Sequence, residues 1–232
     1  MPSPPPATRL WPLPLLAGLL PAAAALIALL LHAQQQGAFC NAFVDDCVSI
    51  SRMAKHGLAN HLFRVLVLPG AVLQCLTWLV AAERFAAAGR GRVAVALMLA
   101  FGLVSAATLV VYGSFLGSDG DIYRWLRRRG TIGYFAGTYV AMLWFLLASR
   151  GLHAAQRLVL PRLHVWALGG LLAFVAAIGI GHGVGTLRGS DTLENLTEWW
   201  AALGLTLTFV VMAAMWRRWE LAAAIDLRSP RA

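Results

Sequence analysis

The stretch Val93–Leu116, VAVALMLAFGLVSAATLVVYGSFL, contains no charged side chain and decides the fold. An α-helix needs about 20 consecutive apolar residues to cross the hydrocarbon core of a bilayer. Five other stretches of the chain have the same character. The six predicted spans are 10–31, 63–82, 93–116, 132–148, 163–181 and 196–216. The sequence therefore predicts an all-α membrane protein whose six transmembrane helices form one bundle.

The composition excludes a water-soluble domain. The 232 residues are 59% hydrophobic and 12% charged, with a formal net charge of +9, whereas soluble domains carry about 25% charged residues. The basic side chains lie in short segments between apolar stretches, which fits topology signals and anionic lipid headgroups better than a nucleic-acid groove. We expect membrane lipids as partners, with other membrane proteins as a further class, and no nucleic acid.

Six spans and their loops use the whole length of the chain. We expect a cytoplasmic N-terminal segment at 1–9, a membrane domain at 10–219 and a cytoplasmic tail at 220–232, because this orientation places more basic residues inside than outside. Both termini are then cytoplasmic. Lys55 is the only lysine and alanine is abundant, a pattern that favours a GC-rich bacterial genome and a location in the inner membrane.

The longest outer loop, 34–62, contains two of the three cysteines. Cys40 and Cys47 would form a disulfide if this loop faces an oxidising compartment. Cys75 lies within an apolar stretch and is expected to be a packing residue.

Glu198 and His182 are the candidate catalytic residues. Glu198 opens the sixth predicted span, where exposed helix amides favour a carboxylate. Alternatively it points inward and pairs with a basic group, because acids at membrane depth are costly and usually paired. His182 lies in the glycine-rich segment Gly179–Gly185 on the same side. It is either solvated or hydrogen-bonded to Glu198.

The sequence has no tight metal-ligand spacing such as H-E-x-x-H, so we expect no metal and no cofactor. Ser49 and Ser51 lack the frame of a serine nucleophile and are better explained as turn or helix-cap hydroxyls.

A run of three arginines in the second outer loop is either a solvated charge cluster or a binding site for phosphate headgroups. Trp125 beside it is suited to the membrane–water interface. The candidate headgroup-binding residues are Arg127, Arg128, Arg129, Asp121, Ser49, Ser51 and Trp199.

Three short segments resemble a known family. They are Phe43–Ser51 (FVDDCVSIS), Gly120–Tyr123 (GDIY) and Asn195–Trp199 (NLTEW). They are similar to the corresponding segments of the six-span DRAM/Frag/Sfk family, which includes the autophagy modulator DRAM, the GPI-anchor lipid-remodelling factor and the N-terminal region of a yeast cell-wall protein. The likeness covers Leu10–Trp219. The chain lacks the Pro before Ile-Ser and the His at the entry to the fourth helix, so it should lack any activity that needs that His.

The resemblance implies a role in membrane lipid organisation, lipid remodelling or autophagy. The leading hypothesis is a lipid-interacting protein that regulates lipid organisation or assists lipid-anchor remodelling. The first alternative is an intramembrane lipid hydrolase or acyltransferase that uses Glu198 and His182. The second is a small-molecule transporter, which ranks last because the helix centres hold almost no charge.

Overall fold

The computed structural model describes residues 8–45, 48–154, 162–218 and 222–223. Six long helices dominate it, and each is long and apolar enough to cross a membrane. They are α1 (Pro12–Gln36), α3 (Gly57–Ala87), α4 (Arg92–Phe115), α5 (Asp121–Ala154), α6 (Arg162–Arg188) and α7 (Asp191–Arg218). The chain is a multi-pass integral membrane protein, and the prediction of six transmembrane helices is confirmed.

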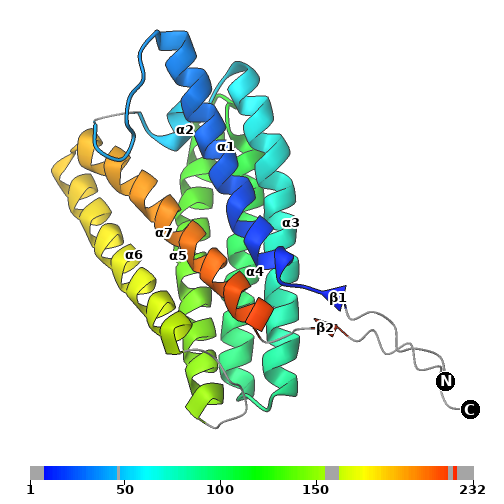
Figure 1. Cartoon of the computed structure of the whole chain (residues 1–232). Helices are drawn as coiled ribbons and strands as arrows, with labels where there is room; N and C mark the ends of the chain where they lie inside the picture. Colours follow the sequence, from blue (N-terminus) through cyan, green and yellow to red (C-terminus); the bar gives the residue numbers. More distant parts are fainter. Residues whose placement is uncertain (1–7, 46–47, 155–161, 219–221, 224–232) are drawn as a thin grey trace, which may run out of the picture.

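Three smaller elements complete the described chain. The short helix α2 (Ile50–Met53) lies in the loop between α1 and α3, and the strands β1 (Thr8–Arg9) and β2 (Ala222–Ala223) flank the bundle. The two strands pair antiparallel, with Thr8 opposite Ala223. This pairing places both ends of the membrane domain at one end of the bundle, which we call the terminal end (Figure 1). We call the opposite end, which carries α2, the loop end.

Several helices extend beyond the predicted spans. The helix α5 begins at Asp121 and not at residue 132, α7 begins at Asp191 and not at 196, and α3 begins at Gly57 and not at 63. Hydrophobicity marks only the part of a helix that lies in hydrocarbon. Arginine and other polar residues with good helix propensity continue the helix into the interface. Most residues of the predicted outer loops that precede residues 132 and 196 are therefore helical.

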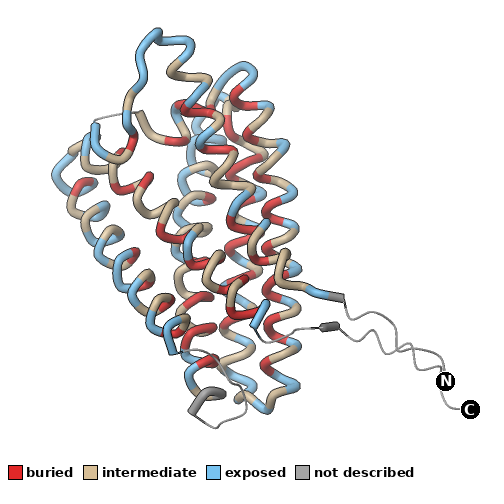
Figure 2. Tube along the Cα trace, viewed as in Figure 1, coloured by how far each residue is buried: buried red, intermediate tan, exposed pale blue. Residues whose placement is uncertain are grey.

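The six long helices form a closed ring in the order α1, α3, α4, α5, α6, α7. The best-packed neighbours are α4 with α5, α1 with α3, and α6 with α7, while α6 contacts α5 less extensively. Figure 1 shows α1 and α7 crossing in front of the more upright α3, α4 and α5. In Figure 2 the buried positions lie mainly on α1, α3, α4, α5 and α7, and α6 is largely exposed. We expect the exposed apolar surfaces to face lipid.

Two hydrophobic clusters are stacked along the bundle. The cluster at the terminal end is built around Trp78, Phe145 and Trp216, and the cluster at the loop end around Phe63, Leu109 and Trp199.

A buried polar layer lies between the two clusters. The Gln74 amide donates to the hydroxyls of Ser105 at 2.9 Å and Thr138 at 3.1 Å, and those two hydroxyls are 2.5 Å apart. The three residues come from α3, α4 and α5. The layer therefore ties three adjacent helices together by hydrogen bonds among uncharged side chains.

Glycines allow α4 and α5 to pack closely. A Cβ built on Gly133 would lie 2.6 Å from Thr108 Cγ2, and one built on Gly137 would lie 3.0 Å from Ser105 Cβ. Small residues serve this purpose in membrane helices. At Gly170 on α6, in contrast, an added Cβ would contact nothing within 4 Å.

Candidate functional site

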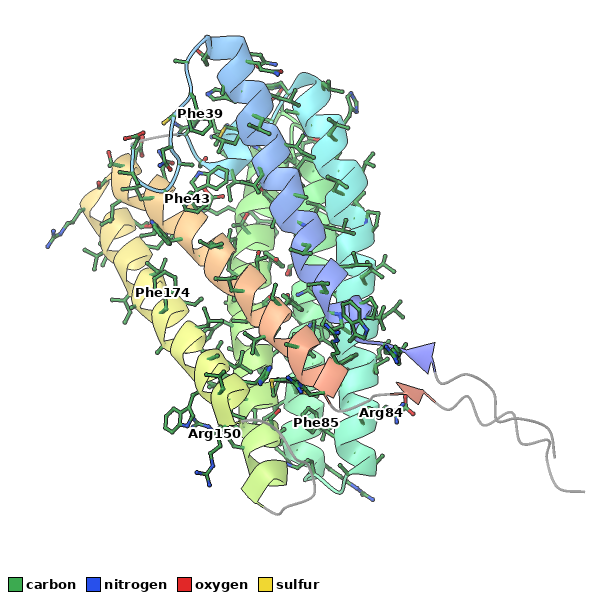
Figure 3. All side chains as sticks on the ribbon, viewed as in Figure 1. Phe39, Phe43, Arg84, Phe85, Arg150 and Phe174 are labelled. Carbon is green, nitrogen blue, oxygen red and sulfur yellow. The ribbon has the colours of Figure 1, made fainter. Side chains whose placement is uncertain are left out.

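The loop 37–49, which precedes α2 at the loop end, is attached to α7 by consecutive residues of that helix. The indole of Trp199 donates to the Val48 carbonyl at 3.3 Å, and that of Trp200 donates to the Phe43 carbonyl at 3.0 Å. The Phe43 ring packs edge-on against both indoles, with centroid separations of 5.8 and 5.3 Å. Figure 3 labels Phe43 where the loop meets α7. We call this set of contacts the loop clamp.

Glu198 contributes to the clamp from the same turn of α7. Its carboxylate lies close to the backbone amides of Ile50 and Ser51, at the start of α2, and to the positive charge of Arg52. Glu198 does not open its helix, because α7 begins at Asp191. Glu198 lines the cavity described below and so points inward, but within the described residues it forms no ion pair with a basic group, as the inward-pointing interpretation expected.

Trp199 is 2% exposed, because the loop covers it. The expectation that Trp199 meets lipid headgroups is therefore wrong. Its sequence position beside the membrane boundary suggested an interfacial residue, but the fold uses it as an anchor for the loop.

Ser49 and Ser51 close the turn before α2. Their hydroxyl oxygens are 3.1 Å apart, and Ser49 Oγ accepts the Arg52 backbone amide at 3.3 Å. Ser49 is thus the N-cap of α2, in agreement with the predicted cap role. Both hydroxyls therefore form hydrogen bonds within this turn.

His182 lies on α6 and does not pair with Glu198. Its Nδ1 is 2.9 Å from the hydroxyl of Thr197, the residue that precedes Glu198 on α7. Successive residues of a helix point about 100° apart, so a contact with Thr197 does not bring the ring to the Glu198 carboxylate. The direct hydrogen bond between Glu198 and His182, one of the arrangements considered for the hydrolase hypothesis, is not formed.

A narrow cavity lies beneath the loop clamp, enclosed by α1, α3, α4, α5 and α7. It has a volume of about 50 Å³, and its polar lining comes from Tyr112, Thr131, Tyr134, Glu198 and Thr206. One water needs at least about 10–15 Å³ of such volume, so this space holds a few waters and excludes a lipid chain or headgroup. The two tyrosines could not be predicted as site residues from the sequence, because each lies inside an apolar stretch without a charged neighbour.

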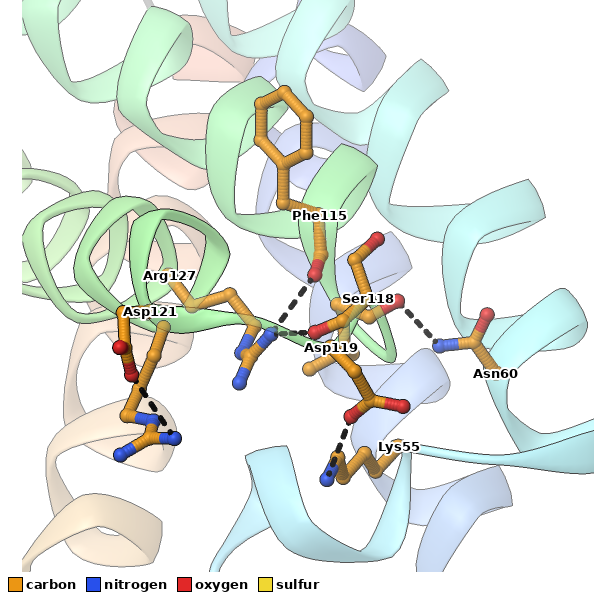
Figure 4. Close-up of polar contacts among 9 residues, drawn as sticks. Lys55, Asn60, Phe115, Ser118, Asp119, Asp121 and Arg127 are labelled. Carbon is orange, nitrogen blue, oxygen red and sulfur yellow. Dashed lines mark hydrogen bonds and ion pairs between the residues drawn. The ribbon is translucent and has the colours of Figure 1, made fainter.

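The run of arginines divides into two groups in the structure. Arg127 points inward, and its Nη1 donates to the carbonyls of Phe115, at 3.3 Å, and Ser118. Figure 4 shows this contact beside the ion pairs Lys55–Asp119 and Arg124–Asp121. Arg127 was expected to bind headgroups, but it satisfies carbonyls at and just beyond the C-terminal end of α4.

Two more side chains complete the cap on α4. Arg64 Nε donates to the Gly113 carbonyl at 3.0 Å, and Arg64 Nη2 donates to Ser114. Asn60 Nδ2 donates at 2.9 Å to the carbonyls of both Leu116 and Ala54. A positive charge at a helix C-terminus is favourable because it meets unpaired carbonyls and the negative end of the helix dipole. The sequence feature that could have indicated this cap is Arg64, a basic residue at the edge of an apolar stretch.

The other two arginines of the run are exposed. Arg129 lies 5.8 Å from the centroid of the Trp125 ring, and Arg128 is also exposed. Ile122, Trp125 and Ile132 are 61%, 54% and 52% exposed, and together with Arg129 they follow a helical spacing along one side of α5. We call Ile122, Trp125, Arg128, Arg129 and Ile132 the α5 interfacial stripe.

The remaining predictions for this end have mixed outcomes. The Asp121 carboxylate is 3.3 Å from the Arg124 guanidinium and is almost fully exposed, so its part in headgroup binding stays a prediction. Cys47 lies outside the described residues, and the Cys40–Cys47 disulfide stays a prediction. Within the part of the chain that the structure describes, no three His, Cys, Asp or Glu side chains gather in a geometry that could hold a metal.

Comparison with protein-family models, with curated proteins and with solved structures gave no match to this chain.

Proposed function

We propose that this protein is a lipid-interacting membrane protein of the DRAM/Frag/Sfk type, which regulates membrane lipid organisation or assists lipid-anchor remodelling. In this proposal the α5 interfacial stripe binds anionic headgroups at the loop end. Arg128 and Arg129 provide the charge, and Trp125 provides a surface at the membrane–water boundary.

The observation that carries the proposal is the combination of exposed arginine, tryptophan and isoleucine on one side of one helix. Exposed apolar side chains favour hydrocarbon, tryptophan favours the interface, and a guanidinium binds phosphate through charge-assisted hydrogen bonds. Because Arg127 is already bonded to carbonyls, the phosphate-binding groups are the other two arginines.

We further propose that the terminal end faces the cytoplasm of a bacterium and that the loop end lies outside the inner membrane. An excess of basic residues at the terminal end favours this orientation. The loop 37–49 would then face an oxidising compartment, where a Cys40–Cys47 disulfide is chemically stable.

The alternatives have less support. The hydrolase hypothesis lacks its direct Glu198–His182 contact, since His182 bonds to Thr197, and the cavity beside Glu198 is too small for a lipid. For a transporter, the buried layer of Gln74, Ser105 and Thr138 is uncharged, whereas charged groups at membrane depth commonly mark ion pathways.

The test compares lipid binding by the double variant Arg128→Gln/Arg129→Gln with that of Arg188→Gln, which removes an exposed arginine from the same end of the molecule. Protein in phosphatidylcholine nanodiscs is titrated with phosphatidylglycerol, and bound lipid is measured by native mass spectrometry. Each arginine at a membrane surface contributes about 1 kcal/mol, so the double variant should bind roughly 30-fold more weakly. Equal binding by the two variants would remove the support for this proposal.

A further inference from the structure

A second arginine-rich site lies at the terminal end, where α5 ends and α6 begins. The described residues that line this cleft are Arg150, Arg162, Val165 and Trp166, and its volume is about 430 Å³. Small-molecule sites commonly measure about 300–1,000 Å³. Unlike the narrow cavity beneath the loop clamp, this cleft is large enough for a phosphate-bearing headgroup.

Arg150 is held in the cleft by uncharged neighbours. Its guanidinium carbon lies 5.7 Å from the centroid of the Trp166 ring, and a Cβ built on Gly169 would lie 3.5 Å from its Nη2. The guanidinium thus lies along the surface of α6, in van der Waals distance of the position of Gly169. Figure 3 labels Arg150 at this end of α5.

Among the residues that the structure describes, neither arginine of the cleft forms an ion pair with a carboxylate. In the described part of the chain the ion pairs are Lys55–Asp119 and Arg124–Asp121, both at the loop end. The acid described at the terminal end is Glu83, which lies on α3 and does not line the cleft. Two guanidinium groups therefore lie at one cleft, and no acid of the described residues lines it.

We propose that this cleft binds a phosphate group, presented in the membrane by the headgroup of an anionic lipid. The planar guanidinium matches phosphate oxygens in a bidentate geometry. Basic pockets between transmembrane helices are recognised headgroup sites.

The surroundings favour a lipid over a soluble phosphate. Trp166 and Leu163 are 70% and 75% exposed beside the cleft, and both offer apolar surface to acyl chains at the level where a headgroup meets hydrocarbon. The site lies at the opposite end of the bundle from the α5 interfacial stripe, and it does not depend on the proposed function.

The test uses the full chain in phosphatidylcholine nanodiscs with two probes, a photoreactive phosphatidylglycerol and inorganic phosphate. Cross-linked peptides report the location of the lipid: Arg162–Trp166 marks this cleft and Asp121–Arg129 marks the α5 interfacial stripe. The variants are Arg150→Gln, Arg162→Gln and Gly169→Leu, which fills the space beside the guanidinium. Arg92→Gln is the matched control, because Arg92 is an exposed arginine at the same end and does not line the cleft.

We expect Arg150→Gln and Arg162→Gln each to lower cross-linking at Arg162–Trp166 about fivefold, as expected for loss of one interfacial charge, and Arg92→Gln to leave it unchanged. Cross-linking at the stripe stays constant in all four variants, which also shows that they are folded. If phosphate alone raises the unfolding temperature of the parent protein but not of Arg150→Gln, the site binds soluble phosphate as well. Cross-linking of both cleft variants at the level of Arg92→Gln, together with no effect of phosphate, would overturn the proposal.

Discussion

Glu198 secures α2 from a position within a predicted membrane-spanning helix. Its carboxylate lies beside two backbone amides of a four-residue helix that is too short to be stable alone. The neighbouring indoles of Trp199 and Trp200 bind carbonyls of the preceding loop. The adjacent α7 residues Glu198, Trp199 and Trp200 thus contact backbone groups on both sides of the turn at Ser49.

Replacing Glu198 with Leu should release α2 without unfolding the bundle. The change removes the carboxylate that lies beside the amides of Ile50 and Ser51, and an unpaired buried amide costs about 1–3 kcal/mol. We expect hydrogen exchange in residues 48–53 to accelerate by at least about tenfold, as measured by mass spectrometry in detergent micelles. Glu194→Leu, one turn earlier on α7, is the control. Equal acceleration in the two variants would show that the Glu198 carboxylate does not hold α2.

The residues of the buried layer, Gln74, Ser105 and Thr138, should not contribute equally to stability. The hydroxyls of Ser105 and Thr138 bond to each other as well as to Gln74, whereas Gln74 Oε1 is buried without a partner. Loss of Gln74 leaves a bonded pair, but loss of both hydroxyls leaves an amide with no acceptor among its present partners.

We therefore expect Gln74→Leu to change the free energy of unfolding by less than about 1 kcal/mol. The double variant Ser105→Ala/Thr138→Val should cost about 1–3 kcal/mol, because it leaves buried donors unsatisfied. Thermal unfolding in one detergent, compared across the two variants, checks the difference. The reverse order of stabilities would contradict this account.

At the scale of elements, the first turns of α5 both contact the end of α4 and present an exposed surface. Arg127 turns toward α4 and binds its terminal carbonyls, while Arg128 is exposed. Neighbouring residues of a helix point about 100° apart, so adjacent arginines can have different roles.

Arg127→Gln should lower the stability of the folded protein by about 1.5–3 kcal/mol, the usual contribution of a hydrogen bond to a charged group. Arg128→Gln should change it by less than about 0.5 kcal/mol. Denaturation midpoints measured in neutral detergent, without anionic lipid, isolate the structural effect. A shift of similar size in both variants would mean that the cap on α4 contributes little.

The contact between α4 and α5 depends on glycine at specific turns. Gly137→Leu should cost about 1–3 kcal/mol because it forces the helices apart at Ser105, where a Cβ already lies 3.0 Å from the neighbouring side chain. Gly170→Leu on α6, where a Cβ meets nothing within 4 Å, is the matched control and should leave the unfolding temperature unchanged or slightly raised.

At the scale of the whole molecule, the ring of six helices places the loop 37–49 and the start of α4 at opposite ends. In a chain with its native cysteines replaced, Val44→Cys and Arg92→Cys should therefore react with a membrane-impermeant maleimide from opposite sides of the membrane. We expect Val44→Cys to be labelled in intact cells and Arg92→Cys only after permeabilisation. Labelling of both from one side would refute the six-span topology.

The sequence predicted the membrane fold well because hydrocarbon imposes one strong rule, a long apolar helix for every crossing. It predicted the ends of α5 and α7 poorly, because hydrophobicity does not report where a helix ends in water. The importance of Glu198 could be inferred from its position near the membrane. Its partners, the amides of Ile50 and Ser51, could not, because they come from a loop about 150 residues away whose path only the packed bundle defines.

The separation between that loop and its clamp has a consequence for how the chain is made. The hydrogen bonds from Trp199 and Trp200 span 151 and 157 positions. A ribosome that adds about 5–20 residues per second needs roughly 10–30 s to produce α7 after the loop has been translated. During this interval four further membrane segments must insert while the loop waits without its anchor. A nascent protein stalled before α7 should therefore be cut by added protease near Phe43, and release of the finished chain should end that sensitivity.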